Sequence, residues 1–222
     1  MKKTAISNIL ATILIMLFIL SSASFSMGKE INAHKATTIQ DANESAIQVV
    51  EKFHLLLLES MKMGDNATCA QRYKLLAPYI KDHFDFPFIS RIVLGRRHWK
   101  KMDQDTKRRF IDAFAKMTIA TYAKRFDSYS GERFETVSSG SDKRGHFVVE
   151  AVLIKPDNEK IGFRYICRKV GNRWKIVSVS AKGVNDLSVK RADYNNFLKK
   201  HSVDELIYWL VAQSEKCLAE KK

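Results

Sequence analysis

Residues 84–131 read FDFPFISRIVLGRRHWKKMDQDTKRRFIDAFAKMTIATYAKRFDSYSG, and the rest of the chain is arranged around this stretch. Pro87 suits the first turn of a short helix, where its missing N–H costs no hydrogen bond. Gly95 is placed to end that helix. Asp103 is a good N-terminal residue for the next helix, in which apolar side chains recur at helical spacing from Phe110 onwards. The stretch therefore predicts a short helix followed by a long amphipathic one.

Two further helices are predicted before this stretch. From Glu44 to Met61 apolar residues recur at alternating steps of three and four, which indicates a helix with one buried face. Residues 64–66, Gly-Asp-Asn, break the pattern. A second helix is predicted from about Ala67, and Pro78 is expected to end or kink it because proline cannot donate a helical hydrogen bond.

After the central stretch the apolar pattern changes from helical to alternating. Four segments are predicted to be strands: 133–137, 146–154, 160–168 and 173–180. The breaks between them are short, which favours antiparallel hairpins, and the first break is placed at Ser139-Gly140. Two helices follow, the second beginning with a capping box of Ser202 and Glu205. The predicted fold class is α+β, a four-stranded antiparallel twisted sheet packed against N-terminal and C-terminal helices.

The N-terminus has the layout of a secretory signal peptide. Two lysines precede an apolar run over residues 6–20, and four small residues follow. The run is shorter than the roughly 20 apolar residues that a membrane span requires, so cleavage is predicted, with an uncleaved anchor as the alternative. The chain is accordingly divided into three parts: a signal peptide over 1–26, a flexible arm over 27–43, and one folded domain over 44–222.

The formal net charge is +14, and removal of the two signal-peptide lysines leaves +12. In an exported protein, such an excess favours anionic lipid headgroups or an acidic partner protein over nucleic acid. Solubility alone is the alternative explanation, because the basic residues are spread along the chain. No nucleic-acid partner is predicted.

The three cysteines, Cys69, Cys167 and Cys217, leave at least one thiol unpaired. They form no C-x-x-C motif, so neither a zinc site nor a thioredoxin-like pair is supported. An oxidising compartment would allow one disulfide. Cys167 lies on the apolar side of a predicted strand, where a buried free thiol is expected.

The sequence contains no recognisable catalytic constellation. No two of the six histidines form H-x-x-H or H-E-x-x-H, and G-x-S-x-G and Gly-rich phosphate loops are absent. Asp85, near His83, is explained more simply as a helix cap. We therefore predict no enzymatic activity and no cofactor. The many large apolar side chains fit either an ordinary core or an apolar pocket between helix and sheet, and periodicity alone does not separate the two.

Several segments, in order along about residues 46–212, resemble the MlaC family of periplasmic lipid carriers, also called toluene-tolerance auxiliary proteins. They are Phe84-Asp85-Phe86, Leu94-Gly95 followed by Trp99, Phe110 to Thr121, Tyr122, Tyr129-Ser130-Gly131, and Arg173-Trp174-Lys175-Ile176-Val177 leading to Gly183-Val184. Residues 120–134 are most similar to the hopanoid-associated HpnM branch. The resemblance implies a monomeric periplasmic carrier that holds the acyl chains of a phospholipid or hopanoid-type lipid in a pocket. It also implies exchange with membrane-anchored complexes at the inner and outer membranes.

The resemblance places the pocket by region, and the alternation in this sequence supplies its side chains. The expected ligand-binding residues are Phe110, Phe114, Met117, Tyr122, Phe126, Phe147, Val149, Leu153, Phe163, Tyr165, Trp174 and Ile176. Arg125 or Lys124 is expected near the pocket mouth, where a cation would meet an anionic headgroup. Two alternatives remain open, a small exported enzyme of a cone-shaped α+β fold and a non-carrier adaptor of a membrane transport complex.

Overall fold

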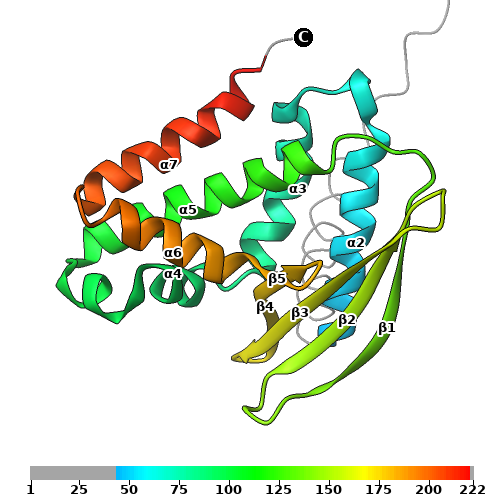
Figure 1. Cartoon of the computed structure of the whole chain (residues 1–222), viewed down its shortest axis with the longest axis horizontal. Coiled ribbons are helices and arrows are strands. Elements are labelled where there is room, and N and C mark those ends of the chain that lie inside the picture. Colours follow the sequence, from blue (N-terminus) through cyan, green and yellow to red (C-terminus); the bar gives the residue numbers. More distant parts are fainter. Residues whose placement is uncertain (1–43, 221–222) are drawn as a thin grey trace, which may run out of the picture. The chain divides into compact units, whose positions relative to one another are not determined.

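The computed structural model describes residues 44–220, and Figure 1 shows its helices and strands. The predicted signal peptide and arm lie outside the described residues. Within residues 44–220, no helix has both the length and the apolar character needed to cross a membrane.

The first two helices begin at capping boxes. Helix α2 spans Ala46–Lys62, and a short 3-10 turn, η1 (Gly64–Asn66), separates it from α3 (Cys69–His83), so the predicted break is confirmed. Pro78 was predicted to end or kink α3, and the first of these alternatives is wrong, because the helix continues for five residues beyond it. Because proline has no N–H, the carbonyl of Lys74, four residues earlier, lacks its helical hydrogen bond. Both residues lie on the exposed side of the helix, where water can donate a hydrogen bond to that carbonyl.

The central stretch forms α4 (Phe86–Lys101) and α5 (Gln104–Arg125). The Asp85 carboxylate caps α4 by accepting a hydrogen bond from the Phe88 N–H at 3.2 Å. Gly95, at φ +73°, interrupts the helical backbone as predicted, and a second helical piece follows it. The Asp103 carboxylate caps α5.

Five antiparallel strands follow in the order β1-β2-β3-β4-β5, which confirms the predicted meander. They span Arg133–Ser141, Phe147–Ile154, Lys160–Val170, Arg173–Ala181 and Val184–Asn185. The two-residue β5 was not predicted. The first turn was predicted too early, because Ser139 and Gly140 pair with β2 inside the ladder. The turn instead forms where the Asp142 carboxylate accepts hydrogen bonds from the N–H groups of Arg144 and His146.

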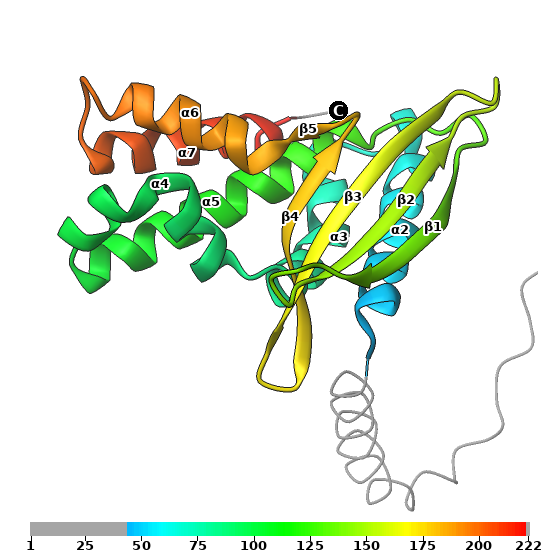
Figure 2. The same ribbon diagram turned by 60° about the horizontal axis from the view of Figure 1, so that its bottom comes forward.

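Two helices complete the described chain, α6 (Asp186–Phe197) and α7 (Val203–Leu218), and the predicted capping box of Ser202 and Glu205 starts α7. Helix α2 lies across the inner face of the sheet and contacts β1 to β4. Figures 1 and 2 show α4 to α7 grouped beyond β4, with α5 between α3 and α7. A disulfide between Cys69 and Cys217 joins α3 to α7, and Cys167 is the buried free thiol that the sequence predicts.

Aromatic rings join the helices to the sheet. Phe53 of α2 is fully buried and meets Phe84, Tyr122 and Tyr165 edge to face. The Asp85 N–H donates to the Ile176 carbonyl of β4 at 3.0 Å, which fixes the start of α4 against the sheet. This packing positions the second half of α5 opposite the inner face of β2 to β4.

Candidate functional site

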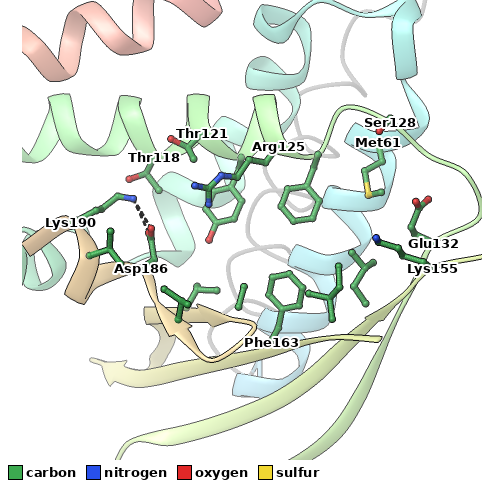
Figure 3. Close-up of a pocket in the computed structure, with 18 residues that line it drawn as sticks. Met61, Thr118, Thr121, Arg125, Ser128, Glu132, Lys155, Phe163, Asp186 and Lys190 are labelled. Carbon is green, nitrogen blue, oxygen red and sulfur yellow. Dashed lines mark hydrogen bonds and ion pairs between the residues drawn. The ribbon is translucent and has the colours of Figure 1, made fainter. Parts of the chain in front are cut away.

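A cavity of about 510 Å³ lies between the second half of α5 and the inner face of the sheet (Figure 3). The end of α2, the loop after α5, β5 and the first turns of α6 complete its walls. Its lining residues are Met61, Thr118, Thr121, Tyr122, Arg125, Phe126, Ser128, Glu132, Leu153, Lys155, Ile161, Phe163, Val179, Ala181, Val184, Asp186, Val189 and Lys190. The volume is within the range of pockets that hold small organic ligands.

The sheet supplies an apolar floor through strand register. Leu153 pairs with Ile161 across β2 and β3, and Phe163 pairs with Ala181 across β3 and β4. Paired residues point to the same face of an antiparallel sheet, so all four side chains meet the cavity. Val179, two residues before Ala181, has the same orientation. Opposite this floor, α5 contributes Tyr122 and the loop after it contributes Phe126.

The inner end of the cavity is closed by side chains held in apolar surroundings. Burial raises the pKa of the Tyr122 hydroxyl, and the Asp186 carboxylate adds to the shift, so this phenol is neutral at physiological pH. Thr118 is only 8% exposed, and its hydroxyl has no hydrogen-bond partner among residues 44–220. Beyond these two residues lies a much smaller cavity of about 20 Å³, which Phe84, Phe86 and others line.

Charged side chains surround the cavity. The Lys190 ammonium lies 2.8 Å from the Asp186 carboxylate, and the Lys155 ammonium lies 2.5 Å from that of Glu159. Arg125 is exposed and makes no hydrogen bond or ion pair with any described residue. Figure 3 shows Lys190 and Asp186 at one end of the cavity, Glu132 and Lys155 at the other, and Arg125 between them on the α5 side. The arrangement combines an apolar interior with an unpaired cation at its edge.

The structure places the twelve expected ligand-binding residues in three settings. Tyr122, Phe126, Leu153 and Phe163 line the main cavity. Phe114 lines the small neighbouring cavity together with Tyr122. The other seven line neither cavity, and they are Phe110, Met117, Phe147, Val149, Tyr165, Trp174 and Ile176.

Most of those seven belong to the packed core. Phe110 stacks on Phe114 and meets Tyr194 edge to face. Phe147 and Trp174 pack together, with ring centroids 5.6 Å apart. The remaining buried residues of this group are Val149, Tyr165 and Ile176, whereas Met117 lines shallower hollows beside α7.

The sequence prediction omitted several lining residues. Ile161 and Val179 share the alternation of Phe163, so the strand pattern contained the signal for them. Val184 belongs to β5 and Val189 to the start of α6, and no periodic pattern in the sequence indicates that these elements lie over the cavity. Thr121 lies within the predicted stripe of α5 and Thr118 beside it, but both are polar, so a search for apolar residues misses them.

The cavity lining contains no histidine or cysteine. In the part of the chain that the structure describes, no group of three or more His, Cys, Asp or Glu side chains is arranged to hold a metal ion. The apolar floor and the Arg125 cation give the site the capacity to surround hydrocarbon and to place positive charge beside it.

Comparisons with known proteins agree with this geometry. The family model described as MlaC protein matches residues 48–211. A search of curated proteins gave no match. Among solved structures, a phospholipid-binding protein from Ralstonia solanacearum, determined in complex with a phospholipid, is similar with a TM-score of 0.67 and 18% sequence identity. The alignment covers 80% of this chain and 100% of that one, and at this identity it shows a shared fold.

Proposed function

Since the chain belongs to the MlaC protein family, we propose that it is a periplasmic carrier that holds the hydrocarbon of a lipid in the cavity between α5 and the sheet. The observation that supports this most directly is the cavity itself, with an apolar floor of strand residues and an opening bordered by charge. The related fold from Ralstonia solanacearum was determined with a phospholipid bound, which favours the same ligand class here.

The energetics of such a site explain how a carrier works without catalysis. Each methylene removed from water contributes ~0.8 kcal/mol, so a two-chain lipid would lose on the order of 20 kcal/mol on release into water. Transfer to another apolar environment is nearly balanced, because the hydrocarbon stays out of water throughout. Lipid therefore leaves the protein at a membrane or at a membrane-anchored complex, and the protein has only to present its opening there.

The charged border indicates which end of the lipid is outermost. Arg125 lies at the cavity edge without a carboxylate partner, so its guanidinium is free to donate hydrogen bonds to a phosphate oxygen of a headgroup. The apolar interior then holds the acyl chains. A phospholipid satisfies both requirements, and a hopanoid-type lipid is the alternative that residues 120–134 favour.

Native mass spectrometry of protein isolated gently from its own periplasm tests the proposal, followed by extraction and identification of any bound lipid. A phospholipid in stoichiometric amount is the expected result. A hopanoid in its place would confirm the carrier and change its cargo. Protein that is consistently free of lipid, and that takes none up from phospholipid vesicles, would contradict the carrier function.

A further inference from the structure

A second hollow, of about 630 Å³, lies between α4 and α6 and shares no lining residue with the lipid cavity. Its cationic side chains come from both helices: Arg96, Arg97 and Lys101 from α4, Arg191 from α6, and Lys199 just beyond α6. No Asp or Glu lines it. We call this hollow, with these five cations, the basic groove.

The interruption of α4 at Gly95 shapes the basic groove. Gly95 has a φ of +73°, a conformation that favours glycine, and the chain changes direction there before Arg96. A Cβ atom built on Gly95 would lie 3.6 Å from a terminal nitrogen of the Arg191 guanidinium. That is an ordinary van der Waals distance, so the Arg191 guanidinium of α6 lies directly beside the chain at Gly95, next to the cations of α4.

These cations lack the partners that other cations of the protein have. Arg96, Arg97, Lys101 and Arg191 make no hydrogen bond or ion pair with any residue in the described range 44–220. The ammonium of Lys199 donates only to the neutral side chain of Asn196.

Several other arginines in the described residues pair with carboxylates. Arg109 contacts both Asp105 and Asp204, and Arg173 contacts Asp82 with two hydrogen bonds. Five cations without a nearby carboxylate repel one another, and a hollow lined by one sign of charge concentrates its electric field on a ligand of the opposite sign.

We propose that the basic groove is a docking site for an acidic, Asp/Glu-rich segment of a partner protein. The groove is concave and has cations on two walls, so an extended chain can be contacted from both sides. A flat bilayer surface cannot enter it, and its apolar residues, Leu94 and Leu198, are buried or half-buried and do not project for insertion. Because the groove is separate from the lipid cavity, docking does not compete with cargo.

Fluorescence anisotropy with a labelled oligo-glutamate peptide tests the proposal on the full mature chain. The variant R96E/R97E/R191E reverses three groove cations. The matched control is K74E/K143E/R144E, which reverses three exposed cations outside the groove and changes the net charge equally. Like charges placed across an interface cost several kcal/mol, so we expect the groove variant to bind the peptide at least ~10-fold more weakly, with much less effect in the control.

Two results would overturn the proposal. Equal weakening in both triple variants would show that the peptide responds to net charge and not to the groove. Loss of binding to phosphatidylglycerol vesicles in the groove variant, with peptide binding retained, would identify the surface as a membrane contact. If charge reversal disturbs folding, the milder R97Q/R191Q variant, which removes two groove charges without reversing them, takes its place. It is also expected to bind the peptide more weakly than the unchanged protein. The two groove variants are expected to retain bound lipid, because the groove shares no lining residue with the lipid cavity. Lipid content and peptide binding therefore test the two proposals separately.

Discussion

At the scale of single residues, Phe163 links the packed core to the cavity. Its ring stacks on Tyr165 toward the core and meets Phe134 edge to face, while it also lines the cavity floor. Phe147 occupies the same face of the sheet at its other end, packed on Trp174 and outside the cavity. The two phenylalanines therefore offer a matched pair for locating the lipid.

We predict that Phe163→Arg abolishes lipid retention whereas Phe147→Arg leaves it largely intact. An arginine on the cavity floor would have to stay charged beside acyl chains, which costs several kcal/mol without a partner. Lipid phosphorus per mole of purified protein is the measurement, with circular dichroism to confirm folding of both variants. Retained lipid in folded Phe163→Arg would show that the hydrocarbon lies elsewhere.

His54 determines a pH dependence of stability. It is 4% exposed and stacks on Phe134 with centroids 4.1 Å apart, and burial lowers its pKa to about 3. The imidazole is therefore neutral in the folded state, whereas in the unfolded chain it binds a proton below pH ~6.5. The contribution of neutral His54 to the free energy of unfolding is fully present above that pH, and it is lost as the pH falls toward the folded-state pKa.

We expect the free energy of unfolding to fall by about 2 kcal/mol between pH 7 and pH 5 because of His54. Urea titrations at both pH values measure it, and His54→Leu should remove most of the difference. Carboxylates whose pKa is lowered, such as those of Asp142 and Glu159, also stabilise the fold, but they lose this contribution at a lower pH. They therefore add little to the difference in stability between pH 7 and pH 5. An unchanged pH dependence in the variant would assign it to another group.

At the scale of secondary-structure elements, local sequence determined most of the fold. Caps at Asp85, Asp103 and Ser202 and the alternation of β2 to β4 were sufficient to place helices and strands. Local sequence was insufficient at two places. Helix α3 continues past Pro78, where solvent can satisfy the free carbonyl, and the β1–β2 turn forms where the Asp142 side chain accepts backbone hydrogen bonds.

The cavity was harder to predict than the elements that form it. Phe114 and Phe163 both point inward, but Phe114 meets Phe86 and Tyr194 in a closed cluster, whereas Phe163 faces open space. Periodicity identifies the inward face of each element and says nothing of the distance between two such faces. That distance depends on how α5 crosses the sheet and on the position of the turn into α6, which are properties of tertiary packing.

The disulfide between α3 and α7 supplies stability at the element scale. It closes a loop of 148 residues, so the chain-entropy model predicts that its removal lowers the free energy of unfolding by about 5 kcal/mol. Urea unfolding of Cys69→Ala/Cys217→Ala measures this loss. Cys167→Ala is the control, since it removes one buried sulfur atom and should cost about 1 kcal/mol. Equal losses in both variants would contradict a structural role for the bridge.

At the scale of the whole molecule, the proposed lipid and the stability of the fold are linked. A cavity of about 510 Å³ lined by apolar side chains leaves those side chains without packing partners when it holds no hydrocarbon. A lipid that binds only the folded protein shifts the unfolding equilibrium by mass action. On the proposed carrier function, the protein is therefore less stable without lipid than with it.

We predict that the loaded protein melts about 5–10 °C above the delipidated protein, because ligand at 100 times its dissociation constant adds ~2.7 kcal/mol to a domain of this size. Differential scanning calorimetry of the two forms measures the shift, with phosphorus analysis confirming the lipid content of each. Phe163→Arg is the control and should show no shift on exposure to the same vesicles. Identical melting temperatures with lipid demonstrably bound would show that the lipid binds the unfolded chain as tightly as the folded protein, because a ligand specific to the folded cavity between α5 and the sheet must raise the melting temperature by mass action.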